Sequence, residues 1–263
     1  MSERKKRIVF MGSRPLGRRV LQFLLDQPDV DIIGMIVQPS DTGRYWKEDP
    51  CDLNVRILRD DKDMTAMDFD LGISVNYWKL IREPVLSHPL LGFVNVHHSH
   101  NLRLRGRNCT TLAILRARED NIWHHGSTLH YVSDQLDAGK IIASRACRIH
   151  DEDTAFTLFH RVEDTSFEML KEWLPRIWRE RIIPYDAPSE FHLWKRSAID
   201  DKEVSLDKSP LDIYDRVRAF VFPPFELPYA FVDGRKRHLT VLRGDETNLL
   251  VDAGQGRCVY WAE

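Results

Sequence analysis

Three histidines lie within four positions of this chain, at His97, His98 and His100, directly after the apolar run LLGFV. Apolar runs of this kind are typical of buried strands, so the histidines come at the end of a rigid element. Asn95 lies two positions before His97, and side chains two apart in a strand project to the same side. The segment therefore predicts a metal cluster, a site of acid–base chemistry, or a polar loop whose histidines are merely solvated or packed.

A metal site is the first alternative. On an extended backbone His97 and His98 face opposite sides, whereas His98 and His100 share one. An H-x-H pair can bind zinc, but no nearby cysteine or carboxylate completes a tetrahedral set at the usual spacing. We expect no metal, and a metal-dependent hydrolase built on the His97/His98/His100 cluster stays open as an alternative.

Acid–base chemistry is the second alternative. Asn95 supplies an amide donor, and His97 supplies an imidazole that gains and loses a proton near neutral pH. Acyl transfer to an amine needs both, because an oxyanion develops on the carbonyl and a proton must leave the attacking nitrogen. A carboxylate that orients the imidazole or a water would complete the set. Asp137 in the turn LDAG is the candidate, and Gly139 would allow tight backbone geometry there.

The first half of the chain alternates strand-like and helix-like segments. This pattern indicates an α/β fold with a doubly wound, mostly parallel, Rossmann-like sheet. We expect a helix that starts near Pro15, and strands at residues 7–11, 31–37, 55–58, 71–75 and 90–96. Ligands of such sheets bind beyond the carboxyl ends of the strands, where the stretches GSRP, NYWKLI and NVHHSH lie.

The second half of the sequence predicts further helices and strands, and it becomes richer in short strands toward the C-terminus. Asp153 or Thr154 caps a long helix with a core-facing aromatic stripe. Other elements are expected at 109–121 (helix), 126–132, 140–149, 229–232, 238–242 and 248–251 (strands). The Asp-Gly pair at 233–234 predicts a hairpin turn. We therefore expect a catalytic domain over residues 1–200 and a small C-terminal β-rich module over 201–263.

Composition narrows the setting. The chain has 263 residues, of which 43% are hydrophobic and 30% charged, with a formal net charge of -2. Lysine and arginine are spread along it, which argues against capture of long nucleic acid. No stretch approaches the roughly 20 apolar residues of a membrane span. The four cysteines have neither zinc-site spacing nor disulfide density, so a cytoplasmic protein is expected, without nucleic-acid or membrane partners.

Taken in order, FVNVHHS, RGRN and GSTLHYVSDQLDAGKII resemble the motifs of formyltransferases that use 10-formyltetrahydrofolate. The hallmarks of that family are N-x-H-P-S, a following L-P-x-x-x-G, and G-x-T-x-H with D-x-G-x-I. The resemblance covers most of residues 7–195. It implies the formyltransferase fold, a folate co-substrate, a homodimer, and a catalytic trio of Asn95, His97 and Asp137.

The same resemblance places the folate pterin between two segments. One comprises Tyr77, Trp78, Lys79, Leu80 and Ile81, and the other comprises Ser133, Asp134, Gln135 and Leu136. Ordinary core packing is the alternative for the first segment. Two departures from the family pattern bear on the acceptor side: His98 stands where proline is usual, and HNLRL replaces the L-P segment.

Family members formylate glycinamide ribonucleotide, methionyl-tRNA or a nucleotide-linked amino sugar. Residues 153–162 and 212–225 resemble segments of sugar N-formyltransferases that act on dTDP-, UDP- or GDP-linked amino sugars, an activity of O-antigen and other surface-glycan biosynthesis. The loop of Arg103, Arg105, Arg107 and Asn108 could meet the diphosphate, or simply be solvated. A methionyl-tRNA or other folate-dependent formyltransferase, and a silent folate- or sugar-binding protein, are the alternatives.

Overall fold

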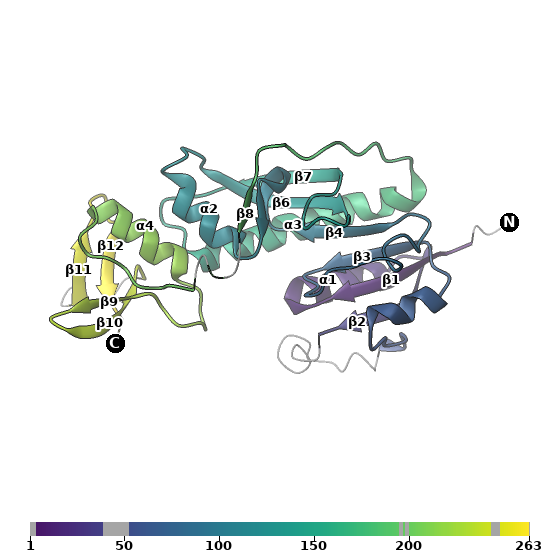
Figure 1. The fold of residues 1–263 in the computed structure, drawn as a ribbon, viewed down its shortest axis with the longest axis horizontal. Helices are drawn as coiled ribbons and strands as arrows, with labels where there is room; N and C mark the ends of the chain where they lie inside the picture. The colour runs from purple at the N-terminus through teal and green to yellow at the C-terminus, as the bar shows by residue number, and fades with distance from the viewer. Residues whose placement is uncertain (1–3, 39–52, 195–196, 198–199, 243–247, 263) are drawn as a thin grey trace. The chain divides into compact units, whose positions relative to one another are not determined.

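The computed structural model describes residues 4–38, 53–194, 197, 200–242 and 248–262. The chain forms two compact units that interleave along the sequence (Figure 1). Unit 1 comprises Met1–Arg103, Gly126–Arg145 and Glu163–Phe191, and unit 2 comprises Leu104–His125, Ala146–Val162 and His192–Glu263. The predicted domain boundary at residue 200 stays a prediction, and Cys51, one of the four cysteines, lies outside the described residues.

A six-stranded sheet with the order β2-β1-β3-β4-β6-β7 is the main element. Its strands are β1 (Lys6–Gly12), β2 (Val30–Val37), β3 (Leu71–Val75), β4 (Phe93–His97), β6 (His124–Tyr131) and β7 (Ile141–Arg148). β1 pairs in parallel with β2 and β3, and β3 with β4, whereas β4 and β6 are antiparallel. The predicted mostly parallel α/β sheet is confirmed.

Apolar residues of β1 alternate between two cores, as the strand period requires. Ile8 and Phe10 belong to a cluster that also contains residues of helices α1 (Arg14–Leu25) and α3 (Ala155–Arg179). Val9 and Met11 belong to a second cluster, with Met64 of the 3-10 helix η3 (Asp61–Ala66). Both predicted helix starts are confirmed: Pro15 lies in the first turn of α1, and the Thr154 hydroxyl accepts from the Thr157 backbone N–H (3.2 Å) ahead of α3.

One strand prediction is wrong, and one small sheet was not predicted. Residues 55–58 form only an isolated parallel bridge, Ile57 to Met35 of β2, so this short run is an edge contact and not a strand. Conversely, β5 (Leu104–Gly106) and β8 (His192–Trp194) make a two-stranded parallel sheet that was not predicted. Each strand is only three residues long, and β5 lies in a polar, arginine-rich segment. Neither strand therefore shows the apolar pattern by which strands are predicted from sequence.

Unit 2 contains helices α2 (Cys109–Ala117) and α4 (Pro210–Phe220). Its four-stranded sheet has the order β11-β12-β10-β9, from β9 (Tyr229–Val232), β10 (Arg235–Thr240), β11 (Leu249–Asp252) and β12 (Cys258–Trp261). Asp233 and Gly234 have φ of 49° and 73°, as the predicted Asp-Gly hairpin turn requires. The C-terminal part is β-rich as expected, although β12 was not predicted. Among the described residues, no helix is both long and apolar enough to cross a membrane.

Candidate active site

The trio of Asn95, His97 and Asp137 lies within unit 1, at the carboxyl end of β4. Side chains alternate along a strand, so Asn95 and His97 lie on the same side of the sheet as Phe93, which packs in the second apolar cluster. His97 Nδ1 lies 3.6 Å from Asp137 Oδ2, and the two side chains are only 12% and 11% exposed. The imidazole and the carboxylate are therefore close enough for Asp137 to orient His97 and stabilise its protonated form.

Asn95 is held by residues on both neighbouring strands. The sheet register places Ser74 of β3 beside Asn95, and Asn95 beside His130 of β6. The Ser74 hydroxyl donates to Asn95 Oδ1 (2.8 Å), and Asn95 Nδ2 lies 3.2 Å from His130 Nε2. Sequence reasoning did not place Ser74 or His130 beside Asn95, although His130 is the histidine of the G-x-T-x-H motif.

The loop that carries Asp137 is tied to β6. Asp137 has a left-handed backbone (φ 48°), and the Tyr131 N–H donates to the Lys140 carbonyl (2.9 Å). A Cβ added to Gly139 would lie 1.6 Å from the Tyr131 carbonyl oxygen. Glycine at position 139 is therefore required by the close approach of two backbone segments, as the tight turn predicted.

The other two histidines lie differently from the sequence expectation. β4 ends at His97, and His100 begins the 3-10 helix η4 (His100–Leu102), so the strand alternation on which an H-x-H metal pair depends does not continue. Burial, and then the charges of His97 and Arg14, lower the pKa of His98 to about 3, so His98 is neutral at physiological pH. Within the part of the chain that the structure describes, no group of three or more His, Cys, Asp or Glu could hold a metal ion.

The first predicted folate segment follows β3. The rings of Tyr77 and Trp78 lie 4.7 Å apart and pack against the second apolar cluster, in which Ile81 is buried. Lys79 Nζ lies 3.4 Å from Asp60 Oδ2, whereas Leu80 is 48% exposed. Core packing thus accounts for much of Tyr77, Trp78 and Ile81, and Leu80 presents an apolar surface to solvent.

The second predicted folate segment lies next to the first. Arg82 Nη1 donates to the carbonyl of Asp134 (3.1 Å), and the Ser133 hydroxyl donates to the carbonyl of Gln135 (3.1 Å). Leu136 is 42% exposed. Arg82 was missed from the sequence, although it directly follows the stretch YWKLI; it joins two segments that lie about 50 residues apart in the chain.

The predicted acceptor-binding residues fall in both units. Arg103 is half-buried in unit 1, whereas Arg105 is buried in β5 of unit 2 with 7% exposure. Arg107 and Asn108 are exposed, and Asn108 has a left-handed backbone (φ 59°) immediately before α2. Their role in binding a substrate stays a prediction.

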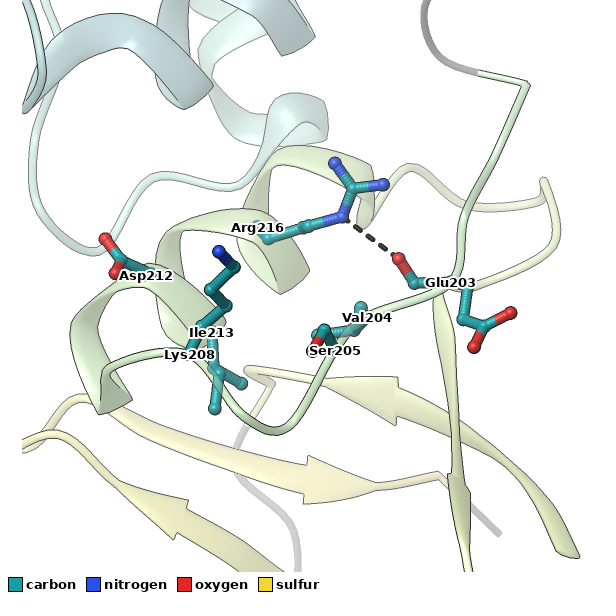
Figure 2. Close-up of a pocket in the computed structure, with 7 residues that line it drawn as sticks. All are labelled: Glu203, Val204, Ser205, Lys208, Asp212, Ile213 and Arg216. Atoms are coloured by element: carbon teal, nitrogen blue, oxygen red, sulfur yellow. Dashed lines mark hydrogen bonds between the residues drawn. The ribbon is translucent and has the colours of Figure 1, made fainter.

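Unit 2 also contains a pocket of about 280 Å³ beside α4. Val204 and Ile213 supply apolar walls, and Lys208 lies at its side (Figure 2). Arg216 donates to the backbone carbonyls of Glu203 (3.1 Å) and Asp201 (3.0 Å). The guanidinium of Arg216 is therefore used to hold the preceding loop against α4.

Comparison with known proteins finds relatives that align with most of the chain. Residues 58–174 match the family model described as formyl transferase. The matched residues form a formyl transferase region that covers less than half of the chain. The chain is 23% identical over 248 residues to the methionyl-tRNA formyltransferase of Pediococcus pentosaceus, covering 88% of this chain and 76% of the relative. It is 25% identical over 267 residues to the enzyme of the same name from Staphylococcus aureus, covering 94% and 83%.

Solved structures of sugar N-formyltransferases share its fold. WlaRD, a sugar 3N-formyl transferase, superposes with a TM-score of 0.77 at 18% identity, covering 97% of each chain. The N-formyltransferase of Helicobacter canadensis gives 0.76 at 16% identity, covering 97% and 98%. A 4-N formyltransferase from Francisella tularensis gives 0.74 at 20% identity, covering 88% and 95%. At these identities the likeness establishes the fold alone.

Proposed function

We propose that this formyltransferase moves a formyl group from 10-formyltetrahydrofolate to the amine of a dTDP-, UDP- or GDP-linked amino sugar, in the synthesis of an O-antigen or another surface glycan. The observation that carries the proposal is the convergence of Asn95, His97 and Asp137 at the end of β4. The fold supports it, because the Helicobacter canadensis relative was solved with folinic acid and dTDP-3-aminofucose, and WlaRD with dTDP and 5-N-formyl-THF.

The donor would lie between the two predicted folate segments. When bound, 10-formyltetrahydrofolate supplies a formyl carbon whose bond to N10 breaks as a bond to the acceptor nitrogen forms. Arg82 links the segments through the Asp134 carbonyl, and Leu80 and Leu136 offer one exposed apolar side chain each. A flat pterin buried against these leucines would gain from apolar contact.

Asn95 is suited to stabilise the oxyanion that forms on the formyl carbonyl. One Nδ2 hydrogen is directed toward His130, and the second is available to the reacting carbonyl. A donor of this kind contributes about 10²- to 10³-fold in kcat when it is prealigned. The Ser74 and His130 contacts indicate that the amide is prealigned before substrate binds.

His97 and Asp137 are suited to handle the proton of the acceptor amine. The uncharged amine attacks the formyl carbon, and the proton it then carries must leave before the product is released. His97 Nδ1 faces Asp137 Oδ2, which leaves Nε2 of His97 as the atom that exchanges a proton with the amine, directly or through a water. Asp137 stabilises the imidazolium while His97 carries that proton, and N10 of tetrahydrofolate receives a proton as it departs.

The acceptor nucleotide is proposed to bind near the arginine-rich loop. Guanidinium groups match the bidentate geometry of a diphosphate, and Arg107 is exposed while Arg103 is half-buried. In this proposal the protein is cytoplasmic and acts as a homodimer. Light scattering would test the homodimer.

A substrate screen tests the proposed function. Purified protein is incubated with 10-formyltetrahydrofolate and each of a set of dTDP-, UDP- and GDP-linked amino sugars, and the sugar is followed for the mass gain of one formyl group. We expect formylation of a subset of sugars that share one amine position. Consumption of the donor with no formylated sugar would contradict the proposal and indicate hydrolysis or another acceptor.

Methionyl-tRNA is the second candidate acceptor. The relatives named above are methionyl-tRNA formyltransferases that align with 88% and 94% of this chain. The same assay with methionyl-tRNA, read by formation of formylmethionyl-tRNA, separates the candidates. Faster turnover of the tRNA than of every amino sugar would replace the first candidate with the second.

A further inference from the structure

Asn95 and the two polar residues that flank it lie side by side on adjacent strands. Ser74 of β3, Asn95 of β4 and His130 of β6 are register partners. Ser74 is 5% exposed and His130 is 2% exposed, so both are withdrawn from solvent. Buried polar groups that are joined by hydrogen bonds hold their geometry more strictly than solvated ones, because each broken bond leaves an unsatisfied group.

The chemistry of the partners determines where the hydrogens are. His130 Nδ1 lies 2.8 Å from the backbone carbonyl of Tyr131, and a carbonyl oxygen only accepts. Nδ1 therefore carries a hydrogen. In the neutral ring Nε2 then has a free lone pair, which accepts from Asn95 Nδ2 (3.2 Å), while Ser74 donates to Asn95 Oδ1 (2.8 Å).

From this arrangement we infer that Ser74 and His130 are positioning residues that hold the Asn95 carboxamide in one of its two orientations, with His130 as the neutral Nδ1–H tautomer. The inference rests on the proposed function, because it matters to catalysis only if Asn95 meets the formyl oxygen. A carboxamide is nearly symmetric in shape, and a half-turn about its last bond exchanges N–H donors for a carbonyl oxygen. The exchanged orientation would repel an oxyanion.

The same atoms could also form a second consistent set of hydrogen bonds, in which His130 is charged and the Asn95 amide is reversed. If His130 were an imidazolium, Nε2 would donate, Asn95 would present Oδ1 to it, and the Ser74 hydroxyl would accept from Asn95 Nδ2. The two arrangements differ in the proton count of His130 and in the face that Asn95 presents. The state of His130 can therefore be measured independently of any substrate.

Gly139 connects this arrangement to Asp137. The Tyr131 carbonyl that accepts from His130 Nδ1 is the same atom that a Cβ at position 139 would meet at 1.6 Å. A side chain at 139 would displace that carbonyl. The loop of Asp137 and the orientation of Asn95 thus depend on one backbone contact.

Kinetics provide the first test. Ser74→Ala and His130→Asn are expected to lower kcat by roughly ten- to hundredfold, the scale of a small misalignment of a catalytic group, with KM for donor and acceptor little changed. His130→Gln should recover part of the rate, because its longer side chain can place an oxygen near the position of Nε2, which the shorter asparagine cannot. Ser166→Ala is the control; this buried hydroxyl donates to Ser127 (2.7 Å) and should leave kcat unchanged.

The double variants decide whether the two residues act through Asn95. In an Asn95→Ala background, Ser74→Ala and His130→Asn should cause no further loss of kcat. A loss as large as in the parent would overturn the positioning role, whether or not each variant folds as well as the parent by circular dichroism.

Nuclear magnetic resonance of ¹⁵N-histidine-labelled protein is the second test and requires no activity. Long-range ¹H–¹⁵N spectra at pH 7, with His130 assigned by the loss of its signals in His130→Gln, should show the neutral Nδ1–H tautomer. An imidazolium or an Nε2–H tautomer would overturn the inference. If the wild type shows the expected tautomer but formylates no amino sugar, then the proposed acceptor fails while the hydrogen-bond arrangement stands.

Discussion

Each unit contains a buried polar network, and the two networks differ in charge. In unit 1, Ser74, Asn95 and His130 are joined by hydrogen bonds between groups that carry no net charge in the arrangement described. In unit 2, Arg118, Asp215 and Arg218 form a chain of ion pairs. Asp215 and Arg218 are buried, as are Ser74 and His130, whereas Arg118 is partly exposed. The unit 1 network ends at Asn95, whose second Nδ2 hydrogen we propose is offered to the formyl carbonyl.

The charges of the unit 2 network are paired with one another, although Nη2 of Arg218 has no hydrogen-bond partner among the described residues. Arg218 is fully buried; its Nε donates to Asp215 Oδ1 (2.7 Å) and its Nη1 to the carbonyls of His150 (3.2 Å) and Asp153 (2.9 Å). Arg118 Nε donates to Asp215 Oδ2 (2.7 Å). These contacts join α2, α4 and the loop before α3. A carboxylate shared by two guanidiniums is directed toward the protein and not toward a ligand, and its removal would leave a buried charge without its partner.

Two buried carboxyl groups extend the contrast. Burial favours a higher pKa for Asp153 in unit 2, yet hydrogen bonds from Arg161 and from the His150 N–H outweigh it, so its pKa lies below the usual value. In unit 1, burial raises the pKa of Glu163 to about 7, although the charges of Arg19 and Arg14 oppose the rise. A bidentate ion pair therefore keeps one carboxyl ionised, whereas the other titrates near neutral pH.

The largest effect is expected at the reactive end of the unit 1 network. His97→Ala and Asp137→Ala should each lower the rate of formyl transfer by about 10²- to 10⁴-fold, and Asn95→Ala by about 10²- to 10³-fold. Because all three side chains lie at the edge of the core, the thermal midpoint of unfolding should change little. Near-normal turnover of His97→Ala would remove the assigned acid–base role.

Removing the central carboxylate of the unit 2 network should affect stability instead. Asp215→Ala leaves two guanidiniums without their shared partner, one of them fully buried, and should lower the free energy of unfolding by about 3–5 kcal/mol. The matched control is Asp120→Ala, which breaks the ion pair between Asp120 and Arg116 near the end of α2. Asp120 is more exposed than Asp215, so this substitution should cost less than about 1 kcal/mol. Equal losses, measured by denaturant unfolding, would contradict the contrast between the two pairs.

Glu163 predicts a pH dependence of stability. Its folded pKa of about 7 lies above the ordinary value of 4.5, so the folded state binds the proton more tightly than the unfolded state. Relative to high pH, protonation of Glu163 therefore adds up to about 3 kcal/mol to the free energy of unfolding. This contribution is complete below about pH 4.5 and is lost as the pH rises through about 7.

Comparing wild type with Glu163→Gln by unfolding at pH 5 and pH 8 checks this dependence. The variant should be the more stable of the two at pH 8 and should lose that advantage at pH 5. A difference that is the same at both pH values would mean that Glu163 does not titrate between them.

A smaller effect on kcat is expected at the contact between the Asp137 loop and β6, where Gly139 meets the Tyr131 carbonyl. Gly139→Ala forces the Asp137 loop away from the Tyr131 carbonyl and should lower kcat by roughly ten- to hundredfold. Gly234→Ala is the control, since a Cβ there meets no atom within 4 Å although φ is +73°. It should cost about 1 kcal/mol of stability and leave kcat unchanged, whereas an unchanged kcat in Gly139→Ala would show that the loop can shift freely.

Local sequence patterns were sufficient for several features of this protein. The alternation of apolar runs predicted the parallel sheet, and the spacing of Asn95 and His97 predicted that both face one side of β4. The Asp-Gly pair predicted the β9–β10 hairpin. Each of these depends on the conformations of residues that are near one another in the chain.

Other features depended on the tertiary structure. Nothing near Ser74 or His130 in sequence indicates that they flank Asn95, because strand order and register decide which residues of β3, β4 and β6 become neighbours. The link from Arg82 to the Asp134 carbonyl and the burial of Arg105 in β5 are likewise long-range. The sequence by itself determined which side chains could carry the chemistry; pairing between distant strands decided which atoms hold them in place, since hydrogen bonds across a sheet join residues that no local period relates.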